Sequence, residues 1–142
     1  MLSLEGLQHF FNLERLELQR AAPSSLEPLR SMNELAHLQI ANYRWEIRDL
    51  SPLGQLYNLR FLSWDNDVAL TAEDFEALSQ LRNLTEFRFG FNNNLSEIDF
   101  VRNHPRLQRI LIGYSNITDF SVLGELEFLE WLLIYELSLI HI

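Results

Sequence analysis

The stretch IRDLSPLGQLYNLRFL, residues 47–62, returns in a modified form as ITDFSVLGELEFLEWL at residues 117–132. Eight of the sixteen positions are identical, and most of the shared residues are leucine or isoleucine. The two copies lie 70 positions apart in a chain of 142 residues. Such an echo indicates that the chain is built from copies of one structural unit.

The apolar residues of the whole chain follow the spacing of this stretch. Each unit places an apolar residue at every third position, five times in succession, and then one more after a step of two. Thirty-five of the 36 positions defined in this way are apolar, and His104 is the exception. The units start near residues 4, 26, 50, 75, 98 and 120, so the period is 22 to 25 residues. This period is typical of a solenoid, in which each unit covers the exposed edge of its neighbour.

The spacing within one unit also predicts its local structure. Steps of three suit tight turns of the 3₁₀ type or extended turns that keep one side chain in three facing inward. The final step of two predicts a short β-strand, because alternate residues of a strand face the same side. In the fifteen residues 69–83, Thr71 precedes Asp74 by three positions, with Glu73 and Glu76 nearby. This pattern predicts a helix N-cap and a short α-helix in the longest unit.

These units resemble leucine-rich repeats, with the pattern LxxLxxLxxLxxLxL running over essentially the whole chain. The joint I-x-D-Φ-S-x-L and the Asn-Leu pairs resemble the internalin-like class with 22-residue repeats. The residues that carry this resemblance are Ile47, Asp49, Leu50, Ser51 and Leu53, then Ile117, Asp119, Phe120, Ser121 and Leu123, with Asn12–Leu13, Asn58–Leu59 and Asn83–Leu84. The resemblance implies an α/β fold, a leucine-rich repeat solenoid of six repeats. A concave parallel β-sheet would face convex turns, 3₁₀ segments and short helices.

One feature departs from this family. Its repeats usually carry an asparagine three residues after the last leucine of the strand, where the amide ties neighbouring turns together. The positions concerned hold Ala21, Tyr43, Asp67, Asn92, Ser115 and Leu137. Only Asn92 matches, so we expect the asparagine ladder to be mostly absent and the turns to be looser.

Composition restricts the classes of function. The eleven basic residues are all arginine, and twenty acidic residues give a net charge of −9. A phosphate backbone would be repelled by this charge, so we expect no nucleic-acid partner. No apolar run reaches 18 residues, and the N-terminus lacks the basic start and apolar block of a signal peptide, so we expect no membrane span. The absence of cysteine suits a reducing compartment. The compartment stays unknown, with a lean to the cytoplasm.

No catalytic, cofactor or metal site is expected. The acidic series from Asp65 to Glu76 follows EF-hand spacing in part, but Leu70 stands where the calcium loop needs glycine. The four histidines have no second histidine or cysteine at ligand spacing. We interpret His104, which precedes Pro105, as a partly buried turn residue.

In a leucine-rich repeat the outward residues of the strands line the concave face, which implies a surface for a protein partner. Here that face is polar at its N-terminal end and aromatic or aliphatic at its C-terminal end. The candidate partner-binding residues are Phe61, Arg88, Arg109, Leu111, Trp131, Leu133 and Tyr135. Exposed aromatic residues in one patch commonly mark an interface. A patch covered by further sequence is the alternative.

The predicted function is therefore a non-enzymatic protein–protein interaction module, formed by a single domain over residues 1–142. The alternative is the recognition arm of a larger enzyme or receptor with its catalytic or signalling domain elsewhere. Neither end carries a polar capping unit, so we expect a fragment of a longer array and regard self-association through the uncapped ends as open. Residues 137–142, LSLIHI, resemble the translated tail of a sequencing adapter, or form an apolar strand that docks on a neighbour.

Overall fold

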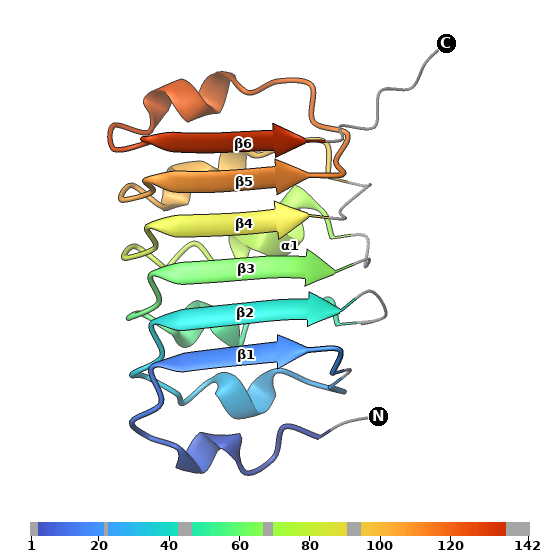
Figure 1. Ribbon diagram of the computed structural model, residues 1–142, viewed down its shortest axis with the longest axis vertical. Helices are drawn as coiled ribbons and strands as arrows, with labels where there is room; N and C mark the ends of the chain where they lie inside the picture. Colours follow the sequence, from blue (N-terminus) through green and yellow to red (C-terminus); the bar gives the residue numbers. More distant parts are fainter. Residues whose placement is uncertain (1–2, 22, 43–46, 67–69, 91–94, 136–142) are drawn as a thin grey trace.

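The computed structural model describes residues 3–21, 23–42, 47–66, 70–90 and 95–135. Six strands form one parallel sheet whose spatial order follows the chain (Figure 1). The strands are β1 (Arg15–Gln19), β2 (His37–Asn42), β3 (Phe61–Asn66), β4 (Glu86–Gly90), β5 (Arg109–Gly113) and β6 (Trp131–Tyr135). Each strand begins one residue before the first of the two inward residues that are separated by a step of two. This spacing in the sequence therefore predicted where the strands lie. The predicted leucine-rich repeat solenoid of six repeats is confirmed.

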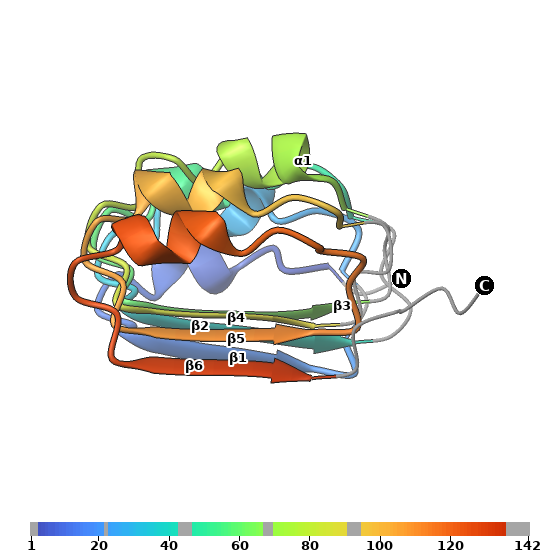
Figure 2. The same ribbon diagram turned by 90° about the horizontal axis from the view of Figure 1, so that it is seen from above.

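Short helices cover the opposite side of the core from the sheet (Figure 2). They are η1 (Leu7–His9), η2 (Glu27–Leu29), η3 (Leu53–Gln55), α1 (Ala72–Glu76), η4 (Asp99–Asn103) and η5 (Ser121–Glu125). All but α1 are 3₁₀ helices, as the steps of three predict. The end strands β1 and β6 lie farther from the helical side than β3 and β4, so the open face of the sheet is concave (Figure 2).

The repeated Asp-x-Ser joint begins two of these helical turns. The Asp49 carboxylate accepts a hydrogen bond from the Ser51 backbone N–H at 2.9 Å, and Asp119 accepts one from Ser121 at 2.8 Å. Hydrogen bonds from Ser51 lower the pKa of the Asp49 carboxyl group, and hydrogen bonds from Ser121 lower the pKa of the Asp119 carboxyl group. An aspartate that bonds its own backbone two residues on forms a turn without help from distant residues. The residues that segments 47–62 and 117–132 share therefore specify the turn as well as the core.

The predicted helix is present as α1, in the longest repeat and on the convex side. The Asp74 carboxylate accepts hydrogen bonds from the Thr71 backbone N–H at 2.7 Å and from its hydroxyl at 3.1 Å. This arrangement satisfies a donor at the start of the helix, which has no partner within the helix itself. Phe75 on its inner side is buried and stacks on Phe100 at 4.8 Å between ring centroids.

His104 is more deeply buried than the sequence indicates. We predicted a partly buried turn residue, but its side chain is completely inaccessible. Its Nδ1 lies 3.1 Å from the carbonyl oxygen of Leu81 in the preceding repeat, and its ring meets Phe87 edge to face. The hydrogen bond to a neighbouring turn lets a polar ring occupy a position that the other repeats fill with apolar side chains.

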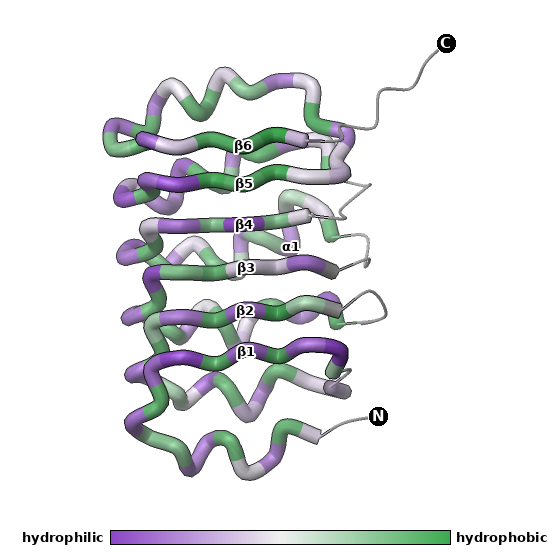
Figure 3. Tube along the Cα trace, viewed as in Figure 1, coloured by the Kyte–Doolittle hydropathy of each residue, from purple (hydrophilic) through white to green (hydrophobic). Residues whose placement is uncertain are grey.

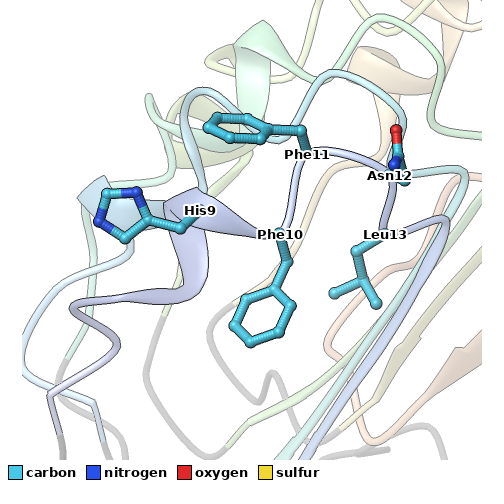
Figure 4. Close-up of a pocket in the computed structure, with 5 residues that line it drawn as sticks. All are labelled: His9, Phe10, Phe11, Asn12 and Leu13. Atoms are coloured by element: carbon cyan, nitrogen blue, oxygen red, sulfur yellow. The ribbon is translucent and has the colours of Figure 1, made fainter.

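Two positions predicted to face inward are open to solvent at the ends of the array. Phe10 is 58% exposed, although its counterparts in the interior repeats are buried. Leu132 is 42% exposed, whereas the equivalent residues of β2 to β5 are inaccessible. Each repeat is covered by the next one, and the described residues include no repeat outside these two. Phe10 and Leu13 point the same way from the first turn, and Phe11 points away from them (Figure 4).

Asparagines do tie neighbouring turns together, but from a different position than the family pattern suggests. The side-chain amide of Asn58 donates to the carbonyl oxygen of Asn33 at 2.8 Å, and that of Asn83 donates to Tyr57 at 2.9 Å. Both belong to the Asn-Leu pairs just before a strand. The expected ladder position Asn92 lies outside the described residues, as do Tyr43, Asp67 and Leu137.

Candidate protein-binding face

The outward residues of the six strands form three rows across the concave face. Because neighbouring strands are parallel and in register, residues at the same strand position lie side by side. The first row is Arg15, His37, Phe61, Glu86, Arg109 and Trp131; the second is Glu17, Gln39, Ser63, Arg88, Leu111 and Leu133; the third is Gln19, Ala41, Asp65, Gly90, Gly113 and Tyr135. The seven predicted binding residues all lie on this face.

A series of aromatic and charged side chains crosses five strands of this face, from β2 to β6. The rings of His37 and Phe61 stack with 3.9 Å between centroids and 2° between planes. The Arg88 guanidinium lies over Phe61 at 5.2 Å from the ring centroid, and the Arg109 guanidinium lies over Trp131 at 4.8 Å. Both contacts have the geometry of cation–π interactions. Four of the predicted residues therefore take part in one structure, which we call the concave ladder.

Glu86 joins the two halves of the concave ladder and was missed by the sequence analysis. Its carboxylate accepts a hydrogen bond from Arg88 Nε at 2.6 Å and lies 3.9 Å from Arg109 Nε. The Glu86 side chain is only 17% exposed, which makes removal of either partner more costly than at an open surface. A spacing of two between Glu86 and Arg88 on one strand was the available signal, since such residues share a face.

His37 is the second residue that sequence reasoning missed. Burial lowers its pKa, and the positive charge of Arg15 acts in the same direction. Its Nε2 is buried without a hydrogen-bond partner in the described part of the chain, and lies 4.0 Å from a Glu17 oxygen. The neutral ring offers a flat apolar surface to Phe61, so the pair widens the aromatic part of the face toward β2.

The C-terminal part of the face is its apolar part. Leu111 and Leu133 are register partners on β5 and β6, and Leu133 is 41% exposed. The middle of β6 is continuously hydrophobic in Figure 3, whereas β1 alternates between hydrophobic and hydrophilic residues. Trp131 and Tyr135 flank this stretch at the two ends of β6. The predicted C-terminal cluster thus lies on the adjacent strands β5 and β6, where its members occupy all three rows of the face.

The described residues hold no group of three or more histidine, cysteine, aspartate or glutamate side chains that could bind a metal ion. Within the EF-hand-like series, Asp67 lies outside those residues. The Thr71 hydroxyl donates a hydrogen bond to the Asp74 carboxylate at the start of α1, so Thr71 acts as a helix N-cap. The longest helices among the described residues, α1, η4 and η5, have five residues each, which is far shorter than a membrane-spanning helix.

Solved structures with a similar fold are internalins of Listeria monocytogenes. Internalin C2 superposes with a TM-score of 0.66 and 25% sequence identity, and covers 97% of this chain. An internalin described as inlF superposes with the same score and 26% identity over 97% of this chain. This chain is an internalin-like leucine-rich repeat protein. No model of a known protein family matches its sequence, and no curated protein does.

This leucine-rich repeat protein spans 70% of the internalin C2 chain and 46% of the inlF chain. The shared part is the repeat array with its parallel sheet. The likeness therefore concerns the solenoid fold.

Proposed function

We propose that this leucine-rich repeat protein is a non-enzymatic interaction module that binds a protein partner on its concave face. Its likeness to internalins supports a role in protein binding in general. The observation that carries the proposal is the exposed Leu133 beside Leu111, on a sheet face that also presents the Arg109–Trp131 stack. Tryptophan and arginine are enriched among residues that dominate binding energy.

The proposed contact residues are Phe61, Arg88, Arg109, Leu111, Trp131, Leu133 and Tyr135. In the concave ladder, Arg88 and Arg109 are held by Glu86 and by aromatic rings. Side chains that are already ordered lose less conformational entropy on binding. The face is thus prepared for a partner that presents flat apolar groups and hydrogen-bond acceptors for the remaining guanidinium donors.

The strands alone are too small for a stable interface. Six strands about 4.8 Å apart span roughly 24 Å, and some 15 Å of exposed strand length gives roughly 360 Å². A stable interface buries about 800 Å² per partner. The partner would therefore also contact segments at the strand ends. The alternative function, a recognition arm of a larger enzyme or receptor, uses the same face and stays a prediction.

The proposal is tested by capture on the immobilised chain followed by affinity measurement. A protein retained by the wild type is identified, purified and titrated against the double variant Trp131→Ala/Leu133→Ser and the control Tyr57→Ala. Tyr57 is exposed in a turn outside the sheet. We expect the concave variant to bind at least about tenfold more weakly, since hot-spot residues contribute roughly 2 kcal/mol or more. The control should bind like the wild type, and equal binding by the concave variant would refute the proposal.

A further inference from the structure

The third row of the concave face places Asp65 between small residues. The register partners of Asp65 are Ala41 on β2 and Gly90 on β4, so its two neighbours in the row have the smallest side chains. Gly113 on β5 is the next residue of this row. The Asp65 side chain is half-buried at this position.

The Tyr135 side chain reaches from the last strand over Gly113 toward Gly90. A Cβ atom added to Gly113 would lie 2.3 Å from the Cζ atom of Tyr135, so the ring lies directly on the glycine backbone. The Tyr135 hydroxyl oxygen lies 3.3 Å from the position that a Cβ of Gly90 would occupy, and Asp65 Oδ1 lies 2.8 Å from the same position. Two oxygen atoms from strands β3 and β6 thus converge above the Gly90 backbone.

The Asp65 carboxylate has no hydrogen bond or salt bridge with any residue that the structure describes. Arg88 is close enough to interact electrostatically, but its Nε donates to Glu86 at 2.6 Å. Burial raises the pKa of Asp65, and the Arg88 charge opposes this shift only in part. The desolvation of this carboxylate is therefore not offset by a direct contact within the described chain.

We propose that a lysine side chain of the protein partner binds above Gly90, with its ammonium group donating hydrogen bonds to Asp65 Oδ1 and the Tyr135 hydroxyl oxygen. This inference rests on the proposed function and names the chemistry of one contact. The charge is complementary, and an ammonium group is a compact donor that suits two single oxygens from different residues. A guanidinium fork suits the two oxygens of one open carboxylate instead.

A titration with a small lysine derivative tests the site without any knowledge of the partner. The ¹⁵N-labelled chain is titrated with N-acetyl-lysine N-methylamide, and the amide resonances of Gly90 and Gly113 are followed. We expect saturable shifts with a Kd on the order of 10 mM, the range for one charged contact at a partly open site. Added salt should weaken the binding, because the contact is between opposite charges.

Matched variants separate the site from non-specific attraction to this acidic chain. Asp65→Asn keeps the shape of the side chain and should weaken binding at least about tenfold. Tyr135→Phe removes one acceptor and should weaken it by a smaller factor. Glu17→Gln alters another concave carboxylate, which Arg15 already contacts at 2.7 Å, and should leave the Kd unchanged. The spectra of each variant also report whether its fold is retained.

Three results would overturn the inference: no saturable shift at Gly90 and Gly113, an unchanged Kd in Asp65→Asn, or equal binding of the uncharged norleucine analogue. The two proposals fail separately. Capture that depends on Trp131 and Leu133 without lysine binding would refute only the lysine site. The opposite result is that the chain binds the lysine derivative, while its captured partner binds the Trp131 and Leu133 variant as tightly as the wild type. That result would refute only the proposed function.

Discussion

The imidazole Nδ1 of His104 lies 3.1 Å from the carbonyl oxygen of Leu81, across two successive repeats and inside the core. The opposite ring nitrogen, Nε2, is buried without a hydrogen-bond partner among the described residues. Burial lowers the pKa of His104, and the nearby charge of Arg82 acts in the same direction, while the Leu81 hydrogen bond and Glu76 oppose it. The folded chain therefore holds the ring in its neutral form.

This relationship predicts a loss of stability in mild acid. An unfolded histidine takes up a proton near pH 6.5, whereas the folded state resists protonation. The unfolded state therefore binds more protons below this pH, and the free energy of unfolding should fall as the pH drops from about 6.5. Urea unfolding of wild type and His104→Leu between pH 7.5 and 5 measures the effect. The variant should show a smaller loss over this interval, and an identical pH slope would contradict the prediction.

The asparagine bridges between turns should contribute measurably to stability. Asn83→Ala removes the bond to the Tyr57 carbonyl oxygen and the acceptor that Arg106 reaches at 2.8 Å. We expect the free energy of unfolding to fall by about 1 kcal/mol, the usual net contribution of a hydrogen bond. Asn12→Ala is the matched control, because this equivalent residue of the first repeat has no bridge within the described chain. Equal effects of the two substitutions in urea unfolding would count against the bridge.

Glu86 and Arg109 should be energetically coupled in the free protein. Their side chains approach to 3.9 Å on adjacent strands, and Glu86 is largely buried. A double-mutant cycle with Glu86→Ala and Arg109→Ala measures this coupling, and we expect about 0.5–1.5 kcal/mol. The same cycle with Glu17→Ala in place of Glu86→Ala should give a coupling near zero. Additive effects for the first pair would show that the concave ladder is only a geometric arrangement.

The exposed ends of the array should make this chain associate with itself at high concentration. Leu132 is 42% exposed at a position that is inaccessible in β2 to β5, and Phe128 nearby is 55% exposed. Large exposed apolar patches commonly mark contact surfaces. Sedimentation velocity over a concentration series should show a rising average mass for the wild type and a smaller rise for Leu132→Gln/Phe128→Ser. A wild type that stays monomeric, or association that Tyr57→Ser reduces equally, would contradict this expectation.

Periodicity was sufficient to predict the backbone. Strand positions, the inward side chains and the α-helix beginning after Thr71 all follow from local rules, because spacing and caps act over a few residues. The identities of the outward residues also followed, since alternation along a strand fixes the face on which each side chain lies. The same rules did not predict the solvent exposure of side chains at the two ends of the array. Phe10 and Leu132 obey the pattern, yet burial requires a neighbouring repeat.

Contacts between repeats were decided by the tertiary structure. Glu86 bridges Arg88 on its own strand and Arg109 on the next, and Tyr135 lies across Gly113 because glycine leaves room there. Such contacts depend on side-chain orientations across neighbouring strands, which no spacing along the chain encodes. The sequence alone thus determined a six-unit solenoid and the list of its concave residues. Only the stacking of the repeats decided which of those residues touch, and that the Asp65 carboxylate is partly desolvated between Ala41 and Gly90.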